Sequence, residues 1–98
     1  MEKLYIVHWS SACSDDDGNV KAYGEIYGVY TSKEDAIKGL VECKDMHYDE
    51  IVQNEEPDTQ QFVIDHTNVY GSEAEEYFEI DYDFCDFPCE IHIAISEQ

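Results

Sequence analysis

The sequence predicts an α+β fold, in which an antiparallel sheet of four to five strands carries one main helix on one face. Several short segments are rich in β-branched and aromatic residues, and two of them alternate apolar and polar residues. One segment after residue 30 instead spaces its apolar residues by three and four, behind a capping signal. We expect these elements to form a single domain, residues 1–98.

The first two predicted strands form a hairpin. Residues 4–9 are apolar on both faces, which is typical of a central strand. A polar stretch follows and contains Asp17-Gly18, which favours chain reversal because glycine accepts positive φ. We expect the chain to return over residues 20–30. Gly24 and Gly28 within this second strand indicate a bulge or a close backbone contact.

The segment Thr31-Ser32-Lys33-Glu34 predicts the start of the helix, with Thr31 as the N-cap and Glu34 reaching back to it. The helix is expected to end between Lys44 and Val52, before a break at residues 55–58. Its expected buried stripe consists of Ala36, Ile37, Leu40, Val41 and Cys43.

Three further strands are predicted, over residues 61–66, 77–84 and 91–95. The alternation in 77–84 directs Phe78, Ile80, Tyr82 and Phe84 to the core. Glu79, Asp81 and Asp83 then line the opposite face, with neighbouring acids about 6.6 to 6.8 Å apart. An edge strand of this sheet, with residues 91–95 as the candidate, would be free to pair with a second copy of the chain.

Charge limits the function more than any other property of the sequence. The net charge is −19, there is no arginine, and residues 45–98 contain sixteen acidic residues and no lysine. Such a field repels nucleic acids and anionic membranes and attracts basic surfaces or cations. We therefore expect a basic macromolecule as partner, and neither direct nucleic-acid binding nor membrane binding.

No catalytic motif is present. The four histidines are scattered, and the sequence has no Gly-x-Ser-x-Gly segment and no glycine-rich phosphate loop. We expect a non-enzyme that needs no cofactor. Because the N-terminal segment lacks the features of a secretory signal, we expect a cytoplasmic protein with reduced cysteines.

The row of Glu79, Asp81 and Asp83 is the leading candidate for a partner-binding surface, because its spacing is similar to the charge row of a nucleic-acid backbone. The alternative is the solvated face of an edge strand, where like charges discourage aggregation. The absence of bases from the second half favours the interaction surface, since ordinary surfaces mix charges of both signs. The residues expected to extend this surface are Glu73, Glu75, Glu76, Asp86, Asp15, Asp16, Asp17, Tyr70 and Tyr77.

Two segments have some features of metal sites. Cys85, Cys89 and His92 form a Cys-x3-Cys-x2-His pattern, which departs from the usual zinc spacing and lacks a fourth ligand nearby. Inert, reduced cysteines are therefore the favoured interpretation. The run from Asp15 to Asn19 is not an EF-hand loop, because no acid lies six residues after Gly18.

In size and composition the whole chain resembles the small acidic phage-encoded inhibitors of bacterial defence, the anti-CRISPR and anti-restriction proteins, several of which mimic DNA. The resemblance implies an inhibitor that acts in the host-cell cytoplasm, and it assigns no functional residues. The leading hypothesis is a nucleic-acid mimic that blocks the basic DNA- or RNA-binding surface of a defence nuclease complex. One alternative is an immunity protein or antitoxin that plugs a basic toxin's active site, and another is a metal-binding or metal-buffering domain.

Overall fold

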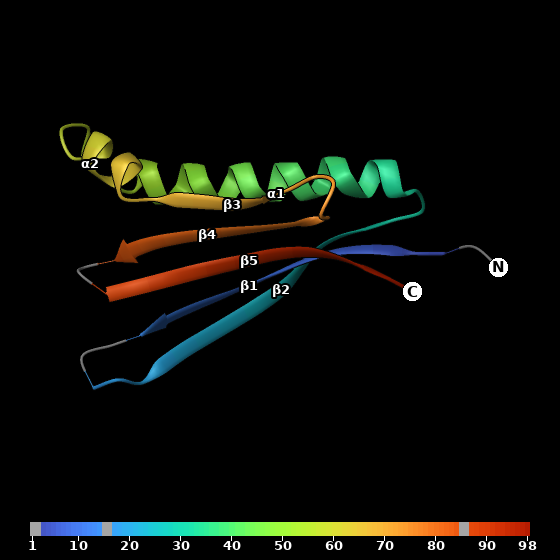
Figure 1. Cartoon of the computed structure of the whole chain (residues 1–98), viewed down its shortest axis with the longest axis horizontal. Coiled ribbons are helices and arrows are strands. Elements are labelled where there is room, and N and C mark those ends of the chain that lie inside the picture. The colour runs from blue at the N-terminus through green and yellow to red at the C-terminus, as the bar shows by residue number, and fades with distance from the viewer. Residues whose placement is uncertain (1–2, 15–16, 85–86) are drawn as a thin grey trace.

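The computed structural model describes residues 3–14, 17–84 and 87–98, and its strands form one antiparallel sheet with both helices on one side (Figure 1). The order across the sheet is β2-β1-β5-β4-β3. The predicted α+β arrangement of five strands and one main helix is confirmed. The elements are β1 (Tyr5–Ser14), β2 (Val20–Tyr30), α1 (Lys33–Gln53), α2 (Gln60–Asp65), β3 (Asn68–Ser72), β4 (Tyr77–Phe84) and β5 (Phe87–Glu97).

Strand β5 lies at the centre of the sheet, between β1 and β4. The sheet consists of two parts whose strands are consecutive in the sequence, the hairpin β1–β2 and the meander β3–β4–β5, and the pairing of β5 with β1 joins them. Val7 of β1 pairs with Ile95 of β5, and Trp9 pairs with Ile93. Residues 91–95, considered above as a candidate edge for pairing with a second copy, are paired on both sides within the chain. The edges of the sheet are β2 and β3.

The predicted hairpin is confirmed, but its first strand is longer than expected. β1 continues through Ser10–Ser14 because residues 10–13 lie between two partner strands and Ser14 still pairs with β2, so their backbone groups are satisfied. Gly18 has a φ of 79°, as the turn requires. The predicted bulge also lies beside Gly28, since Val7 pairs with Gly28 and His8 with Ile26.

Helix α1 starts at a different cap from the predicted one. Ser32 Oγ accepts a hydrogen bond from the backbone N–H of Asp35 at 3.1 Å, so Ser32 is the N-cap instead of Thr31. The helix continues to Gln53, just past its expected end. Ala36, Leu40 and Cys43 are buried as predicted, Ile37 and Val41 are half-buried, and Gly39 and His47 complete the buried face.

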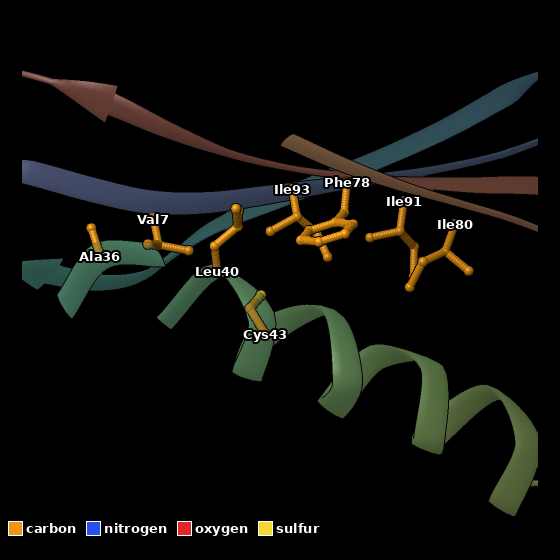
Figure 2. Close-up of a cluster of buried hydrophobic side chains, with 8 residues drawn as sticks. All are labelled: Val7, Ala36, Leu40, Cys43, Phe78, Ile80, Ile91 and Ile93. Carbon is orange, nitrogen blue, oxygen red and sulfur yellow. The ribbon is translucent and has the colours of Figure 1, made fainter. Parts of the chain in front are cut away.

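The core lies between α1 and the sheet, where side chains from both layers point toward one another (Figure 2). The helix contributes Leu40 and Cys43, and the sheet contributes isoleucines from β4 and β5. Burying one such side chain stabilises the fold by about 1.5 to 3 kcal/mol. The eight buried members are Val7, Ala36, Leu40, Cys43, Phe78, Ile80, Ile91 and Ile93.

The strand predicted over residues 61–66 is wrong, because this segment forms helix α2. Local hydrogen bonds favour the helical form: the Thr67 hydroxyl donates to the Val63 carbonyl at 2.6 Å, and the Gln61 amide donates to Asp65 at 2.9 Å. Its apolar residues are consecutive, a pattern that helices and strands share. The strand that pairs with β4 is instead β3, a short segment with little apolar alternation.

His47 is a buried polar side chain within this apolar layer. It is 6% exposed, and its ring meets that of Trp9 edge-on at a centroid distance of 4.4 Å. Its Nε2 atom has no hydrogen-bond partner among the described residues. Burial lowers the pKa of His47, although the charge of Glu50 opposes that shift. The folded protein therefore favours the neutral imidazole.

The prediction of reduced cysteines is wrong for two of the four. Cys13 of β1 and Cys89 of β5 are directly opposite each other in the sheet and form a disulfide across 76 residues of chain. The strand register brings them together, which sequence spacing alone does not show. Cys43 is a free, buried thiol whose pKa is raised to about 12 by burial. Cys85 lies outside the described residues.

We predict that His47→Leu makes stability less sensitive to acid. The pKa of His47 is lower in the folded protein than in the unfolded chain, so the neutral histidine stabilises the fold at pH values above its unfolded-state pKa. This contribution is lost as the pH falls from that value through the folded-state pKa. In thermal unfolding, the melting temperature of the wild type should therefore fall more between pH 7.5 and pH 5.5 than that of the His47→Leu variant. The exposed His66, changed to Gln, is the control and should behave as wild type. Curves of equal pH dependence for wild type and His47→Leu would contradict the prediction.

We also predict that the disulfide stabilises the fold. Because it closes a long loop, the double variant Cys13→Ser/Cys89→Ser should lose about 2 to 4 kcal/mol of unfolding free energy. Urea unfolding with and without reductant measures this loss, and reductant should not affect the double variant. Peptide mapping of the non-reduced protein should recover the two linked segments. Recovery of Cys13 and Cys89 as free thiols would contradict the assignment.

Candidate interaction surface

The predicted carboxylate row on β4 is confirmed as a feature of the sheet. Phe78 and Ile80 are buried against α1, and Tyr82 packs partly against the same core. Side chains alternate along a strand, so Glu79, Asp81 and Asp83 face away from the helix. Asp83 is exposed, while Glu79 and Asp81 are half-buried.

Strand β5 adds two residues, Glu90 and His92, that were not predicted to belong to this surface. Asp81 is paired with Glu90, and Glu79 is paired with His92. We define the acidic patch as Glu79, Asp81, Asp83 and Glu90. The alternation of Glu90 and His92 with isoleucines is visible in the sequence, but their partners follow only from the register of the β4–β5 pair.

A chain of polar contacts runs across the patch. The Tyr77 hydroxyl donates to Glu79 Oε1 at 2.9 Å and also contacts His92 Nδ1. His92 lies between two carboxylates, with Nδ1 3.3 Å from Glu79 Oε1 and Nε2 3.4 Å from Glu90 Oε1. Among the ion pairs of the described residues, the patch acids pair only with His92. No lysine side chain therefore neutralises the patch.

Asp81 is the most constrained carboxylate of the patch. Its Oδ1 atom is shielded from solvent and has no hydrogen-bond partner among the described residues. Burial, followed by the interaction with Glu79, raises the pKa of Asp81 to about 6. The pKa of Glu79 is lowered, mainly by its hydrogen bond with Asp81 and then by that with Tyr77. Two carboxylates are thus held side by side at neutral pH.

The two predicted tyrosines have different environments. Tyr70 is 52% exposed on β3 and pairs with Glu79, so its ring lies beside the patch. Tyr77 is half-buried, and its pKa is raised to about 12 by burial and by the hydrogen bond to Glu79. Tyr77 therefore holds Glu79 of the patch by a hydrogen bond, and the exposed ring of Tyr70 is the one that a partner can contact.

The remaining predicted acids are only partly brought to this surface. Glu73 and Glu75 are exposed in the turn that leads into β4, whereas Glu76 forms an ion pair with Lys33 of α1. Glu76 is therefore directed toward the helix and does not extend the row as predicted. Asp17 is exposed in the turn of the β1–β2 hairpin. Asp15, Asp16 and Asp86 lie outside the described residues.

The pattern of Cys85, Cys89 and His92 does not form the metal site considered above. The sulfur of Cys89 is bonded to Cys13, so it is not available as a thiolate ligand. Cys89 also belongs to the helix-facing set of β5, and His92 belongs to the opposite set. Residues that are an odd number of positions apart in a strand point to opposite faces, so Cys89 and His92 cannot share a metal ion, although they are close in the sequence.

No protein-family model, curated protein or solved structure matches this chain. Neither helix among the described residues combines the length and apolar character needed to cross a membrane. Function is therefore argued from the acidic patch itself.

We predict that Asp81→Asn stabilises the protein in metal-free buffer at neutral pH. The change keeps the side-chain shape, removes a shielded charge beside Glu79 and supplies a donor to it. A gain of about 1 kcal/mol would raise the melting temperature by about 4 to 8 °C. Asp83→Asn removes the same charge from an exposed position and should change the melting temperature much less. Equal increases in melting temperature for Asp81→Asn and Asp83→Asn would contradict the prediction, because they would mean that the effect comes from net charge alone.

Proposed function

We propose that this chain is a non-enzymatic inhibitor that mimics nucleic acid and occupies the basic DNA- or RNA-binding surface of a bacterial defence nuclease complex. The observation that carries the proposal is the acidic patch, a set of carboxylates on two adjacent strands to which no lysine is paired within residues 3–14, 17–84 and 87–98. The proposed site of action is the host-cell cytoplasm, as for the phage-encoded inhibitors that the chain resembles, although a disulfide such as Cys13–Cys89 is uncommon in that reducing compartment.

The position of β4 argues against the simplest alternative. Charged residues on an edge strand discourage edge-to-edge aggregation, but β4 is paired with β5 on one side and β3 on the other. Protection of an exposed sheet edge therefore does not explain its carboxylates. Concentrating like charges on a paired strand costs stability through repulsion, which supports a role in binding for these residues.

The patch has the chemistry to bind a surface rich in lysine and arginine. The backbone positions of successive acids on β4 are about 6.6 to 6.8 Å apart, and Glu90 widens the row onto the next strand. Carboxylates accept hydrogen bonds from arginine in pairs, and the exposed ring of Tyr70 can stack on a guanidinium group. Affinity would come largely from counterions released on contact, as it does for DNA.

The test compares two triple variants with the same change in net charge. Glu79→Gln/Asp81→Asn/Asp83→Asn neutralises the row, and Asp49→Asn/Glu56→Gln/Asp58→Asn neutralises three exposed acids away from the sheet. Each protein is used as bait in nuclease-treated bacterial lysate. The recovered complex is then purified, and displacement of a labelled DNA duplex from it is measured at several salt concentrations.

We expect the row variant to bind at least about ten-fold more weakly at physiological salt and to show a salt slope smaller by up to about three. The control variant should inhibit as wild type does, because its acids lie outside the patch. Equal inhibition by the two variants would place the interface elsewhere. A salt-independent affinity would favour the immunity-protein alternative, in which shape dominates.

A further inference from the structure

Three side chains lie close together on the face of β4 and β5 that points away from α1. Glu79, Glu90 and His92 each offer one ligand atom, and these atoms all lie within 4.8 Å of one another. Glu79 and His92 are cross-strand partners, and Glu90 is two residues from His92 on the same face. The sheet thus brings together two carboxylate oxygens and one imidazole nitrogen.

This donor set is chemically mixed. Imidazole nitrogen suits zinc, nickel, copper and iron, and carboxylate oxygen completes many sites for these ions. Hard ions such as magnesium prefer oxygen alone and retain most of their water. One nitrogen beside two carboxylates therefore favours a first-row transition cation over magnesium or calcium.

The carboxyl of Asp81 adds a further negative group beside this cluster. Asp81 is the cross-strand partner of Glu90 and lies two residues from Glu79, and its Oδ1 is shielded from solvent with no hydrogen-bond partner among the described residues. A buried carboxylate oxygen without a donor is unfavourable. The cross-strand partner of Asp81 on β3 is Asn68, and the partner of Glu90 on β1 is Ala12, so neither of these two positions carries a lysine.

Tyr77 holds the ligands in place from one side. Its hydroxyl contacts both Glu79 Oε1 and His92 Nδ1 and so restrains both side chains, and the His92 Nε2 atom, which faces Glu90, stays free of Tyr77. The side chains of Glu79 and His92 are 23% and 37% exposed, so an ion can reach them from solvent while water completes its coordination.

We infer that Glu79, Glu90 and His92 form a binding site for one divalent first-row transition cation, with Asp81 as the adjacent carboxylate that the ion neutralises. The inference does not depend on the proposed function, because it requires no partner. It also differs from the Cys-x3-Cys-x2-His pattern, since its ligands face away from Cys89.

The experiment is calorimetric titration of the full chain, with its disulfide intact, using Zn²⁺ and, separately, Mg²⁺. We expect one Zn²⁺ per chain and no comparable Mg²⁺ binding. His92→Gln and the double variant Glu79→Gln/Glu90→Gln should each weaken Zn²⁺ binding about ten-fold or more. Circular dichroism checks that each variant is folded.

Matched controls separate a defined site from general attraction to a polyanion. Glu73→Gln/Glu75→Gln removes two exposed acids outside the cluster. This variant should keep the wild-type Zn²⁺ affinity, and so should Cys85→Ser. The inference is overturned if Zn²⁺ does not bind, if the control and cluster variants weaken binding equally, or if Cys85→Ser abolishes binding.

Discussion

Apolar contact between α1 and alternate residues of β4 and β5 is the constraint on which the arrangement of this protein depends. Leu40 of the helix is buried against the sheet together with Ile80 and Ile93 (Figure 2). A shift of either strand by one residue would turn these isoleucines to solvent, so the register is strongly specified. The same constraint directs the acidic residues and His92 to the opposite face. The interaction surface is therefore a direct consequence of how the core packs.

Sequence reasoning succeeded where periodicity and capping signals are strong, and it failed where partners depend on register. The alternation in residues 77–84 was sufficient to predict the facing of Glu79, Asp81 and Asp83. It could not reveal Glu90 and His92 as their neighbours, because that requires knowing how β4 pairs with β5. The disulfide was missed for the same reason, since Cys13 and Cys89 meet only through the β1–β5 pairing. Helix α2 was missed because a consecutive apolar run fits both helix and strand.

The scarcity of cations in the second half of the chain underlies both proposals. Within the acidic patch, His92 and the hydroxyl of Tyr77 moderate the charge. A basic protein surface and a divalent metal ion would each supply the missing positive charge, and both would use Glu79 and Glu90. The two ligands would therefore compete for the same oxygens. Metal binding would lower the affinity for a basic partner, which makes the metal content of the buffer a variable in any binding assay.

The order of the strands also has a consequence for how the chain folds. The hairpin β1–β2 and the meander β3–β4–β5 can each form from local contacts, but they join through pairs as remote as Tyr5 and Glu97. Closing that loop costs entropy before the ladder between β1 and β5 forms, which makes this step slow. Until then, one side of β1 and one side of β5 remain unpaired, and such strands readily capture other chains. The yield of refolding should therefore fall as the concentration of the protein rises.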